Sequence, residues 1–155
     1  MKKIKVLAAL AALSAGLAGC SLMPKKEEPS EFDKETRADD ARVREDKTRT
    51  ALSTLESAVA DYVKAERNIP ATLDPLIPKY LAGIPALDIP ACGGESDEVS
   101  VYPSSVLQGG QVDGKRLKGT GHWGYVFNDR QVVVFVDCLK PSAKGQPWYK
   151  EHGVH

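Results

Sequence analysis

Residues 52–63 read LSTLESAVADYV, and this stretch decides how the chain folds. Its large apolar residues recur at spacings of three and four, which is the period of one face of an α-helix. They are Leu52, Leu55, Val59, Tyr62 and Val63. The residues between them are mostly small, polar or charged, so the predicted helix has one apolar stripe. Such a stripe must be buried, and the strand-rich C-terminal half of the chain is the part available to bury it.

The ends of this helix carry recognisable signals. The helix is expected to end within Glu66–Pro70, because the residue before a proline is disfavoured in the α region. Upstream, Ser30–Asp33 fits a capping box and can start a helix. Between that point and the stripe the only large apolar residues are Phe32 and Val43. We expect a solvated helical stalk here; a partner-binding coiled coil is the alternative, although no heptad repeat is sustained.

Prolines interrupt the apolar segment that follows the helix, from Pro70 to Pro90. Proline fixes φ and has no backbone N–H, so this segment is expected to be an ordered loop over the core. A short helical turn is predicted at Pro75–Tyr80, with proline at its first position. Residues 92–97, CGGESD, have the composition of a turn.

Three later segments alternate as β-strands do: residues 98–102, 121–127 and 131–138. In the second of them, Trp123, Tyr125 and Phe127 share one face. The run Val132–Val136 is apolar on both faces, which is typical of a central strand. We therefore predict an α+β fold in which the long helix packs on a three-stranded antiparallel β-sheet.

Two polar segments flank the second and third strands. Residues 103–120 are rich in Gly, Ser, Lys and Gln and are expected to form a long exposed loop. Residues 140–155 contain prolines, glycines and the pair Trp148-Tyr149, and are expected to form a surface tail that these aromatic residues hold to the fold.

The chain has three cysteines: Cys20, Cys92 and Cys138. Cys92 precedes the first predicted strand and Cys138 ends the last. In an oxidising compartment these two are the natural disulfide pair. The alternative, a metal-binding or reactive pair, lacks both a CxxC spacing and nearby histidines.

Charge argues against nucleic-acid binding. The whole chain has 21 basic and 21 acidic residues. Removing Lys2, Lys3 and Lys5 with the N-terminal segment leaves 18 basic residues against 21 acidic ones. A mildly acidic surface does not displace counterions from phosphates.

The N-terminus has the form of an export signal. Residues 1–5 are positively charged, and residues 6–19 are apolar but shorter than the roughly 20 residues needed to span a bilayer. The segment ends Leu17-Ala18-Gly19-Cys20. This ending resembles the lipobox of bacterial lipoproteins, which implies cleavage between Gly19 and Cys20 and acylation of Cys20. An ordinary cleaved secretory signal, or an uncleaved anchor, is the alternative.

The predicted organisation is thus a signal peptide at 1–19, a lipidated cysteine with a charged tether at 20–38, and one domain at 39–155. The lipobox resemblance implies a membrane-anchored protein of the bacterial cell envelope. Because Ser21 rather than aspartate follows the cysteine, the sorting rule of enteric lipoproteins implies the outer membrane if the host has one.

Several stretches resemble type IV pilins and the pseudopilins of type II secretion. They are residues 55–62, LESAVADY, before the NIP of residues 68–70; residues 73–85, LDPLIPKYLAGIP; and residues 124–127, GYVF. The resemblance covers about residues 41–150 and implies a pilin-like head. However, pilins carry a prepilin-peptidase site and an apolar N-terminal helix, and this chain has neither. The resemblance therefore implies an accessory lipoprotein with a protein partner in the envelope, such as a pilus or secretion apparatus, rather than a filament subunit.

Some pseudopilins bind calcium in a loop, and here Glu95 and Asp97, with Glu98 or Asp113, are weak candidates for oxygen ligands. No EF-hand spacing is present, so a solvated acidic turn is the simpler interpretation. An ion- or small-ligand-binding envelope lipoprotein is accordingly the alternative function.

The sequence predicts no enzyme. The only histidines are His122, His152 and His155, and the last two stand at the end of the chain without a third ligand. No nucleophile elbow, phosphate-binding glycine loop or zinc-protease motif occurs. We expect no catalytic residues, no cofactor and no metal site beyond the weak calcium candidates.

Overall fold

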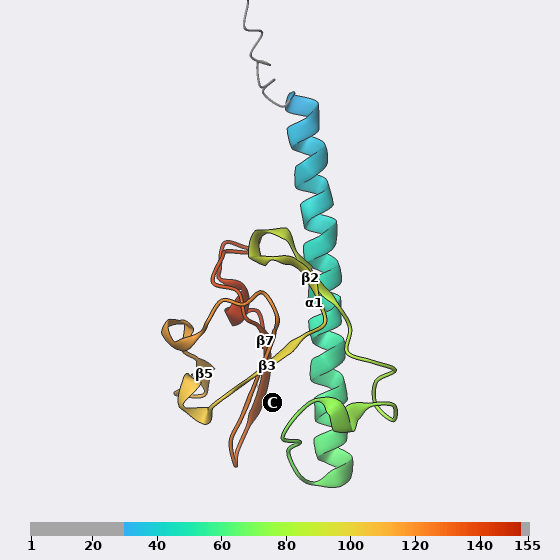
Figure 1. The fold of residues 1–155 in the computed structure, drawn as a ribbon, viewed down its shortest axis with the longest axis vertical. Coiled ribbons are helices and arrows are strands. Elements are labelled where there is room, and N and C mark those ends of the chain that lie inside the picture. The colour runs from blue at the N-terminus through green and yellow to red at the C-terminus, as the bar shows by residue number, and fades with distance from the viewer. Residues whose placement is uncertain (1–29, 153–155) are drawn as a thin grey trace, which may run out of the picture.

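A computed structural model describes residues 30–152 and shows a mixed α+β fold (Figure 1). The fold consists of one long helix, α1 (Glu31–Glu66), and three small sheets. The strands are β1 (Leu87–Ile89), β2 (Gly94–Ser96), β3 (Val99–Tyr102), β4 (Leu107–Gln108), β5 (Gln111–Val112), β6 (Trp123–Phe127) and β7 (Val132–Val136). Short 3₁₀ turns lie between them: η1 (Asp74–Leu76), η2 (Pro90–Cys92), η3 (Ser104–Val106), η4 (Gly114–Arg116) and η5 (Trp148–Lys150).

Helix α1 begins at the capping box that the sequence marked as a possible start, and it ends within the predicted range Glu66–Pro70. The Asp33 backbone N–H donates to Ser30 Oγ at 3.2 Å, and the Ser30 N–H donates to the Asp33 carboxylate at 3.1 Å, which completes the capping box. At the other end Arg67 takes a left-handed conformation, with φ of 55°. Residues 31–38, assigned to the tether from the sequence, are the first turns of this helix.

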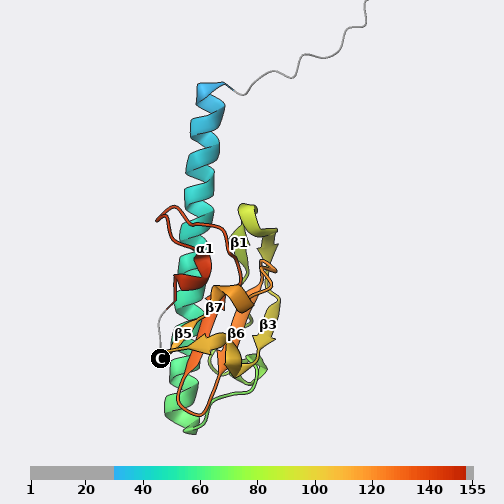
Figure 2. The same ribbon diagram turned by 90° about the vertical axis from the view of Figure 1, so that its left-hand side faces the viewer.

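The predicted apolar stripe is buried against the sheet. Leu52, Leu55 and Val59 are almost fully buried, and Tyr62 and Val63 are partly so. They share one core with residues of β6 and β7: Trp123, Tyr125, Val132, Val134 and Val136. By contrast, Phe32 is 76% exposed and Val43 is 54% exposed, so the N-terminal part of α1 is the solvated stalk expected (Figure 2).

The three-stranded sheet is mixed, so the antiparallel prediction is wrong. Its order is β3-β6-β7; β6 and β7 are antiparallel, but β3 runs parallel to β6, with Val99 opposite Trp123. The reason is the connection over residues 103–122, which is long enough to return the chain to the end where β3 started; parallel strands require such a crossover. The predicted central strand, β7, is at an edge, and β6 is central.

Residues 103–120 form a cover for the sheet and are not the exposed loop expected. They contain η3, the β4–β5 hairpin and η4, and they bury Val106 and Val112. A second core lies beneath them on the sheet face opposite α1, with Tyr102, Val126, Val133 and Phe135. This cover explains why β7 is apolar on both faces although it is an edge strand.

The proline-rich segment is fixed to the sheet by two aromatic side chains. Trp123 Nε1 donates to the Pro85 carbonyl at 2.7 Å, and the Tyr125 hydroxyl donates to the Pro70 carbonyl at 2.6 Å. The helical turn expected at Pro75–Tyr80 is the shorter η1. Residues 92–97, expected as a turn, belong partly to β2, which pairs with β1. Buried Thr48 of α1 bonds to both backbone groups of Asp88 in β1.

The disulfide between Cys92 and Cys138 is formed, as the sequence predicts, and closes a separation of 46 residues. The segment after it is not a surface tail, because Trp148 is fully buried in the main core. Trp148 therefore holds this segment to the fold, as expected. Its side chain is buried in the main core rather than at the surface.

Candidate functional site

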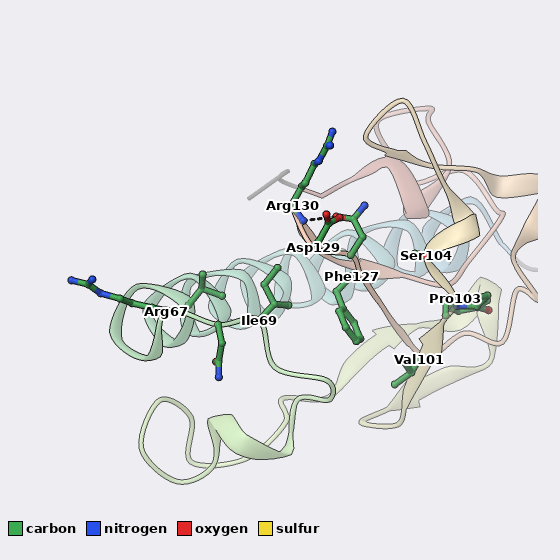
Figure 3. Close-up of a pocket in the computed structure, with 12 residues that line it drawn as sticks. Arg67, Ile69, Val101, Pro103, Ser104, Phe127, Asp129 and Arg130 are labelled. Atoms are coloured by element: carbon green, nitrogen blue, oxygen red, sulfur yellow. Dashed lines mark hydrogen bonds between the residues drawn. The ribbon is translucent and has the colours of Figure 1, made fainter.

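A recess in the described structure lies where α1 ends. It is a groove of about 1160 Å³ between the C-terminal end of α1, the end of β3 and the turn that joins β6 to β7 (Figure 3). Its lining comes from three separate parts of the chain: residues 63–69 of the helix end, 101–104 of β3 and η3, and 127–130 of the turn.

The groove has an apolar floor and a charged rim. Val63, Ile69 and Phe127 are partly buried and contribute to the floor, and Val101 is 51% exposed beside them. Arg67, Asp129 and Arg130 are exposed at its rim. Within residues 30–152, neither Arg67 nor Arg130 forms an ion pair. Among the described residues, the groove therefore combines an apolar floor with two cations that have no ion-pair partner.

Local backbone structure holds the rim residues in place. The left-handed conformation of Arg67 turns the chain sharply out of α1, so that Ile69 faces the sheet. In the β6–β7 turn, Asn128 Oδ1 accepts from the Arg130 N–H at 2.8 Å and from the Gln131 N–H at 2.9 Å. The Phe127 ring of the floor packs against the buried Tyr125 ring, with the two ring centres 5.8 Å apart. The gap at residues 128–130 between two predicted strands indicated a turn here, but nothing in the sequence showed that the turn would meet the end of α1.

The weak calcium candidates are not brought together as a site. Glu95 lies on β2 and Asp97 follows it, both exposed. Asp113 instead accepts the Lys115 N–H at 3.0 Å and caps η4. Across residues 30–152, no three His, Cys, Asp or Glu side chains lie close enough to hold a metal ion.

The histidines occupy separate places. His122 lies just before β6, and its Nδ1 is 3.2 Å from the carboxylate of Glu98, which lies just before β3. His152 is at the end of the described chain, and His155 lies outside it. Gly19, Cys20 and the signal peptide at 1–19 also lie outside the described residues.

Four donors surround a buried carboxylate that sequence reasoning missed. Asp137 is fully buried and accepts from the Tyr102 hydroxyl, the N–H groups of Gly119 and Thr120, and the Thr120 hydroxyl, at 2.5–3.0 Å. Burial opposes its ionisation, but the hydrogen bonds from Tyr102, Thr120 and Gly119 lower the pKa of Asp137 below its ordinary value. Burial, followed by the bond to this carboxylate, raises the pKa of Tyr102 to about 12. The network fastens residues 118–120 to the end of β7.

The Asp137 network predicts acid sensitivity. Because the folded pKa lies below the unfolded value of about 3.9, its stabilisation is fully present at neutral pH and is lost as pH falls through the folded pKa. We expect Asp137→Asn to lower the free energy of unfolding by about 1–3 kcal/mol at pH 7 and by less at pH 3. Urea unfolding followed by tryptophan fluorescence at both pH values measures this. Exposed Asp97→Asn is the control, and equal losses for Asp137→Asn at the two pH values would contradict the assignment.

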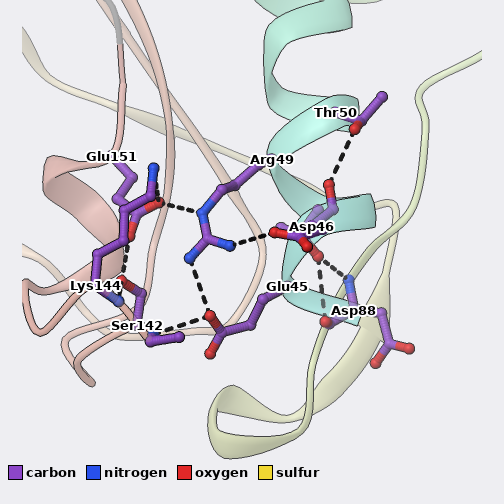
Figure 4. Close-up of polar contacts among 10 residues, drawn as sticks. Glu45, Asp46, Arg49, Thr50, Asp88, Ser142, Lys144 and Glu151 are labelled. Carbon is purple, nitrogen blue, oxygen red and sulfur yellow. Dashed lines mark hydrogen bonds and ion pairs between the residues drawn. The ribbon is translucent and has the colours of Figure 1, made fainter. Parts of the chain in front are cut away.

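A second charged cluster joins α1 to the C-terminal segment (Figure 4). Arg49 contacts the carboxylates of Glu151 at 2.7 Å, Asp46 at 2.9 Å and Glu45 at 3.0 Å, and its Cζ lies 5.0 Å from the centre of the Trp148 ring. Burial opposes ionisation of Glu151, yet the hydrogen bonds from Arg49 and Ser142 lower the pKa of Glu151. Every charge here has a partner, so the cluster is structural.

The described residues contain no helix that is both long enough and apolar enough to cross a bilayer. No protein-family model matches the chain, and searches of curated proteins and of solved structures found no match.

Proposed function

We propose that this chain is a lipid-anchored protein of the bacterial cell envelope whose head binds another envelope protein. It serves as a structural or interaction component, accessory to a type IV pilus or a type II secretion apparatus. The observation that carries the proposal is the arrangement of α1: Cys20, the residue that would be lipidated, precedes the helix in the sequence, and the groove lies at the C-terminal end of the helix (Figure 3).

The dimensions of α1 support this role. A helix of 36 residues is about 54 Å long at 1.5 Å per residue. Its first turns are exposed and charged, with acidic Glu31 and Asp33 near the capped end. Such a rigid, solvated spacer holds the groove away from a membrane surface. Two or more acyl chains on Cys20 would anchor the protein stably, since each buried CH₂ contributes about 0.8 kcal/mol.

The resemblance to pilin heads supports the same conclusion in part. The long helix, the proline-rich segment after it and the β6–β7 hairpin follow the arrangement that the resemblance implies. The parallel pairing of β3 with β6 departs from it. The proposal therefore rests on an anchored head with a binding groove, and the choice of a pilus or secretion apparatus follows from the resemblance alone.

Replacing the cysteine of the lipobox tests the anchor. We expect Cys20→Ser to move the protein from the membrane fraction to the soluble fraction after cell lysis, because no acyl chain can be attached. Metabolic labelling with a palmitate analogue should mark the unaltered chain and leave the variant unlabelled. Cys92→Ser keeps the lipobox and is the matched control for loss of a cysteine. A Cys20→Ser protein that stays in the membrane fraction would overturn the anchoring.

The interaction half of the proposal is tested separately by photo-crosslinking in cells. A photoreactive residue at Ser104, which lines the groove, should give a defined adduct with one envelope protein. The same residue at Lys34, on the stalk, is the control. Equal adducts from both positions, or none from either, would contradict a partner at the head.

A further inference from the structure

Strand β3 presents an unpaired edge beside the groove. It is the first strand of the order β3-β6-β7, and none of the other described strands pairs with its outer side. The Trp123 N–H donates to the Glu98 carbonyl at 2.9 Å, so the backbone groups of Glu98 point toward β6. Successive residues face opposite ways in such a ladder. The backbone groups of Val99 and Val101 therefore point to the free edge, where an extended chain can bond to them.

The groove continues from this edge and offers side-chain contacts to the same extended chain. Val101 is 51% exposed and lies between the edge and the floor formed by Ile69 and Phe127. Alternate side chains of an added strand point to one face. Those on the α1 side of the sheet would meet this apolar floor. Because β3 has only four residues and Pro103 follows it, these side-chain contacts must supply much of the affinity.

Charge complementarity selects the partner segment. Arg67 and Arg130 stand on the rim without ion pairs, and Asp129 is the one acidic residue among those lining the groove. A smaller recess of about 280 Å³ shares Val63, Ile69 and Arg130 with the groove and adds Lys64. The groove thus carries three cations nearby against one carboxylate, which favours an acidic partner segment at this end of β3. The acidic residues Asp97 and Glu98 lie at the other end of the strand, just before β3.

We propose that the β3 edge and its groove accept an extended, acidic segment of a protein partner as an added strand. One large apolar side chain of that segment lies on Ile69 and Phe127, and its flanking carboxylates pair with Arg67 and Arg130. This inference rests on the proposed function, because it states the chemistry of the partner that the anchored head binds.

The test uses the full chain in nanodiscs of zwitterionic lipid. The probe is a fluorescein-labelled nine-residue peptide of alternating threonine and valine, with a central phenylalanine and glutamates at both ends; its comparator has lysines in place of the glutamates. Fluorescence anisotropy gives both affinities. We expect the lysine peptide to bind at least about tenfold more weakly, since like charges face each other across the rim.

Hydrogen–deuterium exchange locates the bound peptide. At a peptide concentration of about ten times Kd, the Val99 and Val101 amides should exchange about tenfold more slowly, because only the unbound fraction exchanges. Amides of the opposite edge strand, β7, should be unaffected by the peptide.

Two sets of variants separate the backbone and charge contributions. Val101→Pro removes an amide that faces the free edge, where proline is tolerated, and should weaken binding about tenfold. Val101→Thr also changes the side chain but keeps the amide, and should bind more tightly than Val101→Pro, so that the difference between the two variants reports the backbone bond. Arg67→Asn with Arg130→Gln should weaken binding about fivefold at low salt. Arg37→Gln with Lys47→Gln removes the same charge from the stalk and should have no effect.

The proposal is overturned if the acidic peptide does not bind, if both peptides bind equally, or if Val101→Pro binds as tightly as Val101→Thr. A concentration-dependent dimer protected at Val99 and Val101 would likewise assign the edge to a second copy and overturn it. None of these outcomes changes where the Cys20→Ser protein fractionates or whether a groove crosslink forms, so failure here is distinguishable from failure of the proposed function.

Discussion

Replacing both Cys92 and Cys138 with serine is expected to lower the free energy of unfolding by about 4 kcal/mol. The disulfide closes a 46-residue separation, and a cross-link of that length removes this much chain entropy from the unfolded state on the loop-closure model. Small domains are commonly stable by only about 5–15 kcal/mol, so the loss is a large part of the total. Urea unfolding of the oxidised chain and of the double variant measures it.

The location of the bridge adds a specific expectation. Cys92 ends η2, and Cys138 follows β7, so the bridge ties the β1–β2 hairpin to the sheet edge. Gly121 packs closely against Cys92, because an added Cβ would stand 1.7 Å from the Cys92 carbonyl oxygen. Reduction of the unaltered chain should reproduce the loss seen in the double variant. If Cys92 and Cys138 both react with a thiol reagent in the native, non-reduced protein, the bridge is absent and this prediction fails.

Trp148→Ala is expected to destabilise the head by about 3–5 kcal/mol, the usual range for removing a fully buried aromatic side chain. Trp148 is fully buried in the main core and lies under the Arg49 guanidinium. Its loss leaves a cavity, and it also frees the segment that carries Glu151, whose side chain is 5% exposed and pairs with Arg49. Thermal unfolding followed by far-UV circular dichroism measures the effect, since it does not depend on the tryptophan removed.

Two variants make this prediction specific. Trp148→Phe keeps most of the buried surface and the aromatic face, and should recover more than half of the loss. Phe32→Ala removes an aromatic side chain that is 76% exposed and should leave the melting temperature unchanged. An alanine variant at residue 148 that melts within a degree or two of the original chain would show that the C-terminal segment is not part of the core.

The sequence predicted the elements that depend on local patterns of residues. The stripe from Leu52 to Val63 specified the helix, its buried face and its partner sheet, because a period of 3.6 residues is recorded in the sequence itself. The capping box at Ser30 and the turn at Asn128 were equally local. The pairing of Cys92 with Cys138 followed from their positions at the ends of strands.

What the sequence could not reveal depends on contacts between distant segments. Alternation marks β3 as a strand but carries no information on its direction, so its parallel pairing with β6 was missed. The cover formed by residues 103–120 depends on two medium-sized side chains, Val106 and Val112, set among polar residues. Asp137 gave one usable signal: an acidic residue directly after a run of buried valines needs donors. The groove left no signal in the sequence, because the three segments that line it meet only in the folded molecule.

The ion pair between Arg49 and Glu151 joins residues 102 positions apart. Residues 31–66 can form a helix as soon as they are synthesised. The apolar stripe of this helix cannot be fully buried until β7 and Trp148 have also been synthesised. The growing polypeptide therefore has no closed interior for most of its synthesis. Throughout that interval the apolar stripe of α1 stays exposed to solvent.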